Sequence, residues 1–147
     1  MQSLTLAQAS TIVDVAIKTA RDQKFQPLSV AVLDAGGHLV AFKREDKSGI
    51  LRFDVAYGKA WGALGMGFGS RTLAERAAAT PQFFTMLAAA SGGRMVTNPG
   101  GVLIRDADGD IIGAVGISGD TGDNDETCAI AGVEAAGLKA DAGGSKK

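Results

Sequence analysis

Cysteine and histidine are nearly missing from this chain of 147 residues, which has one of each. A single cysteine cannot form a disulfide within the chain, and a single histidine cannot build a zinc site from several imidazoles. Positive charge is not in surplus, since 15 lysines and arginines stand against 16 aspartates and glutamates. Nucleic-acid binding requires basic residues that neutralise phosphates, so we expect no nucleic-acid partner.

Long hydrophobic runs are also missing. None approaches the roughly 20 residues that cross a bilayer, so we expect no membrane partner. The first eleven residues lack the basic stretch and apolar core of a secretory signal peptide. Together with the single cysteine, these absences predict a cytoplasmic protein. The chain length and its 46% of hydrophobic residues are typical of one globular domain.

Periodic apolar residues predict several helices. The first runs from Thr5 to about residue 24, and Thr5 and Gln8 have the spacing of a capping box. Further helices are expected over residues 50–66, 70–78 and 81–90, and from Asp123 onward, with Glu126 as the capping partner of Asp123. Residues 140–147 are small and polar, which predicts a disordered tail after a single domain over residues 1–139.

Two β-hairpins of similar design are expected between these helices. Residues 28–33 and 38–43 flank an Asp-Ala-Gly-Gly turn, and residues 102–106 and 110–117 flank an Ala-Asp-Gly turn. A shift of 72 positions aligns Asp34 with Asp106 without a gap. The hairpins either form one antiparallel sheet of four or five strands, or share only the residues that any tight turn selects. Helices around paired hairpins predict an α+β fold.

The second turn has the spacing of the first ligands of a calcium loop, with Asp106, Asp108 and Asp110 at alternate positions. The bidentate acid of such a loop belongs eleven positions after Asp106, where this chain has Ile117. We therefore interpret this stretch as a turn. The strand that follows, residues 111–117, is apolar at nearly every position, so both of its faces should be covered by helices or by a partner subunit.

Acidic residues gather where the last helix begins. Free backbone N–H groups at a helix start attract anions, and Asp123 could cap them. Asp125 and Glu126 either compensate the helix dipole or handle a proton in catalysis. Cys128 lies one turn into this helix, where the dipole could lower the pKa of its thiol, although a buried structural thiol is the alternative.

Lys59 and His38 each permit two interpretations. Lys59 lies in an otherwise apolar, small-residue helical stretch, so its amine either reaches to solvent or meets an anionic ligand. His38 follows the first turn and is either an ordinary strand histidine or, as the only imidazole, a general base or haem iron ligand. Metal coordination is therefore expected only as haem ligation by His38.

Five stretches in the order of a known family resemble the GlcG/HbpS proteins, from about residue 4 to 138. They are Ser29–Phe42, Lys59–Trp61, Pro99–Ile104, Ile112–Gly119 and Asp125–Gly132. The resemblance implies a profilin-like fold, an antiparallel sheet of about five strands flanked by helices, in a homo-oligomer. Family members include haem binders, a domain attached to corrinoid adenosyltransferases, and proteins encoded beside organic-acid catabolism.

Two ligand-dependent functions are compatible with these features, beside a non-catalytic assembly module that binds no ligand. The first is binding of haem or a small carboxylate in a pocket between residues 99–101, the Lys59 helix and the start of the last helix. Its expected ligand-binding residues are Lys59, Arg52, His38, Gly100, Gly101, Asp123 and Cys128. The alternative is an isomerase, lyase or dehalogenase acting on a small organic acid, with Glu126 or Asp125 moving the proton. The low-bulk helix face of Gly58, Gly62 and Gly65 could admit another helix, and we expect an even-numbered homo-oligomer.

Overall fold

A computed structural model describes residues 3–144 of the chain. These residues form an α+β fold, as the sequence predicts. The helices are α1 (Leu6–Asp22), α2 (Leu51–Met66), α3 (Ser70–Ala79), α4 (Pro81–Ala90) and α5 (Gly122–Ala135). The strands are β1 (Ser29–Asp34), β2 (Leu39–Arg44), β3 (Gly101–Arg105), β4 (Ile111–Ser118) and β5 (Lys139–Asp141).

The five strands form one sheet in the order β2-β1-β4-β3-β5, with every neighbouring pair antiparallel. The two predicted hairpins, β1–β2 and β3–β4, join through β1 and β4, so that Val32 lies opposite Val115. The single antiparallel sheet is therefore confirmed, and β1 and β4 lie inside it.

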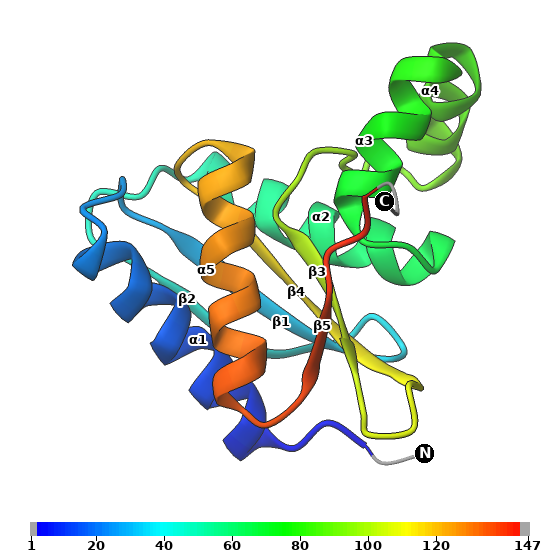
Figure 1. Cartoon of the computed structure of the whole chain (residues 1–147). Helices are drawn as coiled ribbons and strands as arrows, with labels where there is room; N and C mark the ends of the chain where they lie inside the picture. The colour runs from blue at the N-terminus through cyan, green and yellow to red at the C-terminus, as the bar shows by residue number, and fades with distance from the viewer. Residues whose placement is uncertain (1–2, 145–147) are drawn as a thin grey trace.

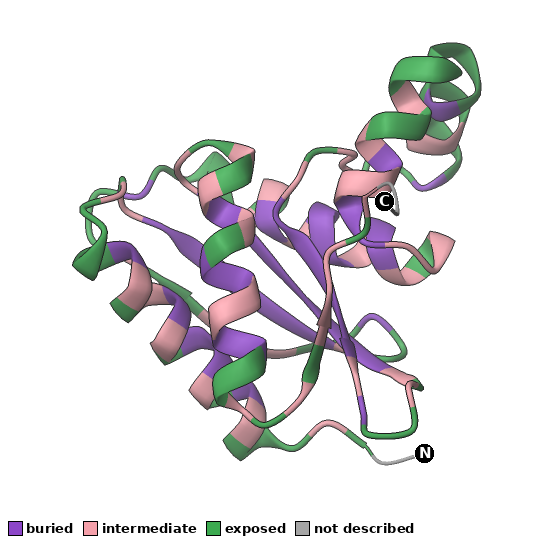
Figure 2. Ribbon diagram, in the orientation of Figure 1, coloured by how far each residue is buried: buried purple, intermediate pink, exposed green. Residues whose placement is uncertain are grey.

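Helices cover both faces of the sheet (Figure 1). Helices α1 and α5 lie together on one face, over a core that includes Val30, Val32 and Val115. Helix α2 covers the other face, where Leu33 and Ala114 pack against it. Because neighbouring residues of a strand point to opposite faces, β4 needs apolar side chains almost throughout. Figure 2 shows the resulting buried strands between partly exposed helices.

The start of α1 agrees with its predicted capping box, in which Thr5 Oγ1 accepts from the backbone N–H of Gln8. The prediction for the last helix is wrong. Helix α5 begins at Gly122, and Thr121 is its N-cap, accepting from the backbone N–H of Asn124. The Thr121 hydroxyl, one residue before the helix, caps its N-terminus in place of the predicted pair Asp123 and Glu126.

The predicted disordered tail is wrong for residues 140 and 141, which belong to β5. This strand pairs with β3, placing Ala140 opposite Ile104. The next residues are also held, since the Gly144 backbone N–H donates to Thr72 Oγ1 at 2.8 Å. Residues 145–147 lie outside the described part of the chain, as do residues 1–2.

Helices α3 and α4 form an arm that projects away from the sheet (Figure 1). The low-bulk face of α2 meets the chain after this arm. A Cβ atom added at Gly58 would collide with the Arg94 carbonyl oxygen at 2.2 Å, and one added at Gly62 would lie 3.0 Å from Met95 Cγ. The close approach expected of these glycines therefore takes place within the chain, against an irregular segment. Within residues 3–144, none of the helices has the length and apolar character that a membrane span requires.

Candidate functional site

Lys59 of α2 and Asp125 of α5 form an ion pair in the interior of the protein. Lys59 Nζ lies 3.3 Å from Asp125 Oδ2 and donates to the Ile117 carbonyl at 2.8 Å. The other Asp125 oxygen accepts from the backbone N–H of Asp120 at 2.9 Å. The side chains of Lys59 and Asp125 are only 2% and 1% exposed, so in this conformation their charges meet each other and not a dissolved ligand.

The glycine loop before β3 closes over this ion pair. A side chain at Gly100, whose φ is +123°, would come within 2.8 Å of Lys59 Nζ. The Gly101 backbone N–H donates to Ser70 Oγ at 2.7 Å, which fixes the loop against α3. Arg52 lies about two helical turns before Lys59 and donates to Ser118 Oγ at 3.1 Å. The structure thus brings together most of the residues predicted for a pocket, but packs them against one another.

Burial shifts the ionisation of both partners. It lowers the pKa of Lys59 and raises the pKa of Asp125, and the charge of each partner offsets part of the other's shift. Such shifts occur in catalytic acids and bases and in structural ion pairs alike. The near-complete burial here is typical of an ion pair that positions α2 against α5 and the end of β4.

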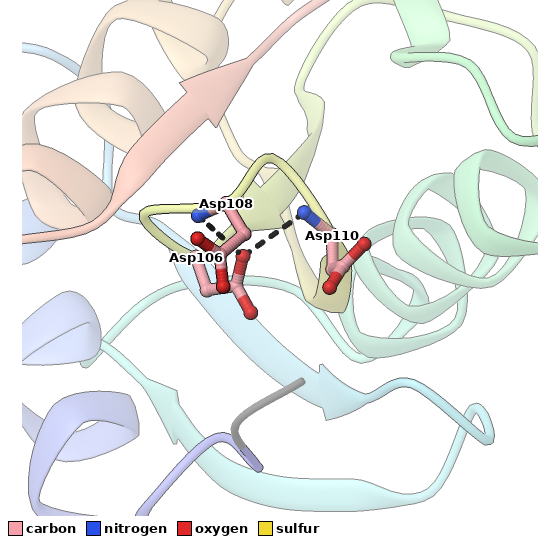
Figure 3. Close-up of side chains that lie close together, drawn as sticks. All are labelled: Asp106, Asp108 and Asp110. Carbon is pink, nitrogen blue, oxygen red and sulfur yellow. Dashed lines mark hydrogen bonds between the residues drawn. The ribbon is translucent and has the colours of Figure 1, made fainter.

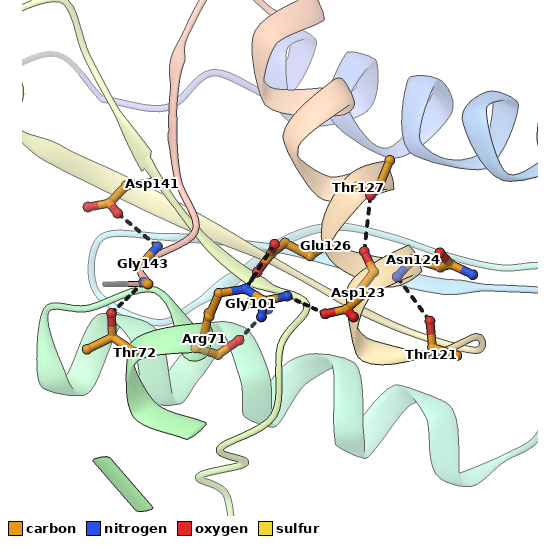
Figure 4. Close-up of polar contacts among 12 residues, drawn as sticks. Arg71, Thr72, Gly101, Thr121, Asp123, Asn124, Glu126, Thr127, Asp141 and Gly143 are labelled. Atoms are coloured by element: carbon orange, nitrogen blue, oxygen red, sulfur yellow. Dashed lines mark hydrogen bonds and ion pairs between the residues drawn. The ribbon is translucent and has the colours of Figure 1, made fainter. Parts of the chain in front are cut away.

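Glu126 and Asp123 point to the outside of α5, where Arg71 of α3 binds both (Figure 4). Arg71 Nε donates to Glu126 Oε2 at 2.9 Å, and its Nη2 donates to Asp123 Oδ1. The two acids raise the pKa of the Arg71 guanidinium above its ordinary value. Arg71 was not among the residues singled out from the sequence, because nothing in a surface helix indicates which acid an arginine will meet.

Cys128 lies on the inner face of α5, in the hydrophobic core, and is fully buried. Burial, together with the negative charge of Asp125, raises the pKa of its thiol to about 12. A thiol of this kind stays protonated and is a poor nucleophile. The structure therefore supports the buried structural thiol, and the lowered pKa considered from the sequence is wrong.

His38 immediately precedes β2, at the end of the sheet that lies away from the Lys59–Asp125 ion pair. Its side chain is 80% exposed. Its Nδ1 is 3.2 Å from Asp34 Oδ1. The same carboxylate oxygen accepts the backbone N–H groups of Gly36 and His38. Burial acts to raise the pKa of Asp34, but these hydrogen bonds outweigh it and hold the pKa below its ordinary value. The carboxylate thus stays ionised and faces the imidazole.

A cavity of about 360 Å³ opens beside His38. Its apolar wall consists of Leu4, Ala35, Val40 and Ile112, and its polar wall includes Asp34 and Ser3. The structure therefore separates His38 from the other residues predicted to bind the ligand. It also adds Asp34 to the candidate ligand-binding residues. The spacing of four residues between Asp34 and His38, across a tight turn, could have indicated this contact.

Asp106, Asp108 and Asp110 come close together at the second turn (Figure 3). Asp106 Oδ1 accepts from the backbone N–H groups of Asp108 and Asp110, each at 3.0 Å. Asp34 makes the same two bonds, to the groups two and four residues later, in the first turn. The acidic cluster is explained by this repeated turn, in which Asp110 stands where the first hairpin has His38.

No protein of curated function matches the chain in sequence. A PduOC–haem complex has a TM-score of 0.83 at 24% identity, covering 93% of this chain and 97% of PduOC. The Klebsiella pneumoniae protein ORFY has a TM-score of 0.84 at 25% identity, with coverages of 93% and 92%. HbpS itself has a TM-score of 0.78 at 27% identity, with coverages of 91% and 90%.

A family model described as "Haem degrading protein HbpS-like" matches residues 4–134. The match spans α1 to α4, strands β1 to β4 and nearly all of α5, and it contains both hairpins and both candidate sites. The chain therefore belongs to the HbpS-like family.

Proposed function

We propose that this protein binds haem at the cavity beside His38, with the imidazole as an axial ligand of the iron. The observation that carries the proposal is the pairing of an exposed imidazole with a partly exposed carboxylate at the mouth of a cavity. When bound, haem would supply an iron whose axial position accepts an imidazole nitrogen.

The Asp34–His38 pair has the arrangement common to metal-binding histidines. Such a histidine donates one ring N–H to a carboxylate, which fixes the tautomer and makes the other nitrogen a better ligand. The Nδ1 atom of His38 lies within hydrogen-bond distance of Asp34. In the tautomer with hydrogen on Nδ1, the Nε2 lone pair is then available to iron, and the high exposure of the ring leaves it accessible.

The cavity also suits part of an apolar macrocycle. Its volume lies within the usual range of ligand pockets, roughly 300–1,000 Å³, and Leu4, Val40 and Ile112 offer apolar contacts. A neighbouring cavity of about 160 Å³ shares Ala35 and Gly36 of the turn and is lined by Trp61. The turn therefore separates two apolar-walled hollows, with the imidazole beside the larger one.

The comparisons support haem as the ligand class. The family's description names haem, and PduOC, a protein of the same fold, has been solved in complex with it. At 24% identity that likeness extends to the fold alone. The choice of His38 therefore rests on the geometry of this chain.

The alternative enzyme and the pocket at the start of α5 stay predictions, as do the even-numbered homo-oligomer and the cytoplasmic location. An enzyme acting on a small organic acid through Asp125 would need the buried Lys59–Asp125 ion pair to open. The haem proposal needs no such rearrangement, because His38 is already exposed.

Haemin titration of the wild type and of His38→Ala tests the proposal through the Soret band. We expect the variant to show a shifted Soret maximum and at least about tenfold weaker binding, since an axial ligand is lost. Added imidazole should restore the wild-type spectrum, which a purely structural role of His38 would not allow. Identical spectra and affinities in the two proteins would overturn the proposal.

A further inference from the structure

A cavity of about 380 Å³, distinct from the His38 cavity, lies between α3 and the chain that follows β5. We call it the arginine cavity. It shares no lining residue with the His38 cavity. Its walls include Phe68, Thr72, Arg76, Arg105, Asp141 and Gly144.

The arginine cavity carries more positive than negative charge. Arg105 is neutralised by Asp141, whose Oδ2 lies 3.0 Å from both its Nε and its Nη2. Arg76 is different, because within residues 3–144 it forms no ion pair. The lining residues therefore leave one guanidinium without a counter-charge, which favours an anionic ligand.

Stacking holds the Arg76 guanidinium in place. Its central carbon lies 4.3 Å from the centre of the Phe68 ring. A guanidinium that lies over an aromatic ring uses its face for this contact and keeps its in-plane N–H groups for an acceptor. This arrangement suits the two oxygens of a carboxylate.

Thr72 offers a second donor to the cavity. Its Oγ1 accepts the backbone N–H of Gly144, which leaves the hydroxyl proton to be donated elsewhere. Two backbone N–H groups at the start of α3 are already used, since those of Arg71 and Thr72 donate to the carbonyls of Ala142 and Gly69. The donors that carry the inference are therefore the side chains of Arg76 and Thr72.

A second hollow of about 290 Å³ adjoins Arg76 on the arm. We call it the arm cavity, and it is lined by Met66, Arg76, Ala79, Thr80, Phe83 and Phe84. Apart from Arg76 and Thr80, these side chains are apolar. One guanidinium therefore borders both a polar and an apolar hollow, which is the arrangement expected for an acid with a hydrocarbon chain.

We infer that the arginine and arm cavities together bind an organic carboxylate, with its charged group on Arg76 and Thr72 and its apolar chain against Phe83. This site is separate from the proposed haem site and does not depend on it. It also differs from the pocket predicted at the start of α5, because its cation lies at the surface and forms no ion pair with another residue of the described stretch 3–144.

Calorimetric titration with hexanoate, acetate and 1-hexanol tests the inference. We expect hexanoate to bind more tightly than acetate, which lacks the chain, and than hexanol, which lacks the charge. Arg76→Gln should weaken hexanoate binding by about tenfold or more, because a charge-assisted hydrogen bond is lost. Phe83→Ala should weaken the binding of hexanoate and leave that of acetate unchanged.

Arg44→Gln is the matched control, because it removes the charge of an exposed arginine on β2 that lines neither cavity. It should bind hexanoate like the wild type. Arginine Nε–H NMR signals of the wild type give a second measurement that needs no variant, in which hexanoate shifts the Arg76 signal and not the Arg44 signal. Equal binding of hexanoate by Arg76→Gln and the wild type, or of hexanol and hexanoate by the wild type, would overturn the inference.

Discussion

Two acid–base pairs in this protein show how burial separates a structural role from a binding role. Lys59 and Asp125 are sealed between α2, β4 and α5, at 2% and 1% exposure. His38 and Asp34 lie at the mouth of a cavity, at 80% and 39% exposure. Both pairs combine a basic with an acidic side chain, yet only the second offers an atom to a ligand without rearrangement.

The two pairs also differ in how their hydrogen bonds are used. Lys59 donates to a carbonyl and to Asp125, whose other oxygen accepts from the backbone of Asp120. In the exposed pair, Asp34 fixes both the turn and one imidazole nitrogen, and the imidazole side chain is 80% exposed. A buried network whose polar groups are all hydrogen-bonded holds the elements of the fold together. An exposed pair that keeps a free polar atom can instead bind a ligand.

The largest effect is expected from Lys59→Met, which leaves the Asp125 charge buried without a partner. Removing one member of a buried ion pair costs about 3–5 kcal/mol in the free energy of unfolding. Denaturant unfolding at neutral pH measures this loss. The double variant Lys59→Met/Asp125→Asn should recover part of it, and an unchanged stability in the single variant would show that the pair contributes little.

Asp34→Asn should weaken haem binding with little loss of stability. Asparagine keeps the Oδ1 acceptor for the backbone N–H groups of Gly36 and His38, but removes the charge that orients the imidazole. Loss of such a supporting partner typically weakens metal binding by about 10–100-fold. Haemin titration and thermal unfolding measure the two effects, and haem affinity equal to that of the wild type would separate Asp34 from the site.

A smaller effect is expected at Asp120, which borders the buried pair. Backbone N–H groups of Gln26 and Thr121 and the Asn124 amide lower the pKa of its carboxyl below the usual value. A lowered pKa contributes stability that is present above pH ~4 and is lost as the pH falls through the folded-state pKa. Asp120→Asn should therefore be less stable than the wild type at pH 7 and nearly equal to it in strong acid. A stability difference that stays constant across this range would contradict this explanation.

The smallest effect is expected at Cys128, where a thiol reagent should react slowly with the native protein at pH 8. The thiol is fully buried and its pKa is raised to about 12. Addition of denaturant should release one fast-reacting thiol per chain. Rapid modification of the native protein would show that the end of α5 opens readily.

Most of the fold could be predicted because its elements have local patterns. The capping box of Thr5 and Gln8, the two Asp-Gly turns and the apolar β4 each determine their own structure. Strand β5 has only three residues, one of them Ala140, and no apolar alternation, so its pairing with β3 depends on where α5 ends. The start of α5 was misplaced because Thr121, Asp123 and the residues around them are all good N-caps.

The candidate sites could be predicted only in part. Lys59 and Asp125 were both singled out and do meet, but the sequence could not show that their contact excludes solvent. His38 was identified because it is the only imidazole, whereas its partner Asp34 was treated as a turn residue. Arg76 carries no local pattern at all, since its place in a cavity follows from the packing of α3 against the chain after β5.

Histidine labelled with ¹⁵N offers the most direct test of haem ligation, because His38 is the only histidine in the chain. Resonance Raman spectra of the haem-loaded protein, with and without the label, would then report on one residue. Coordination by His38 predicts an iron–nitrogen vibration whose frequency falls with ¹⁵N. Spectra of haem-loaded protein that show no isotope shift would contradict His38 as the axial ligand.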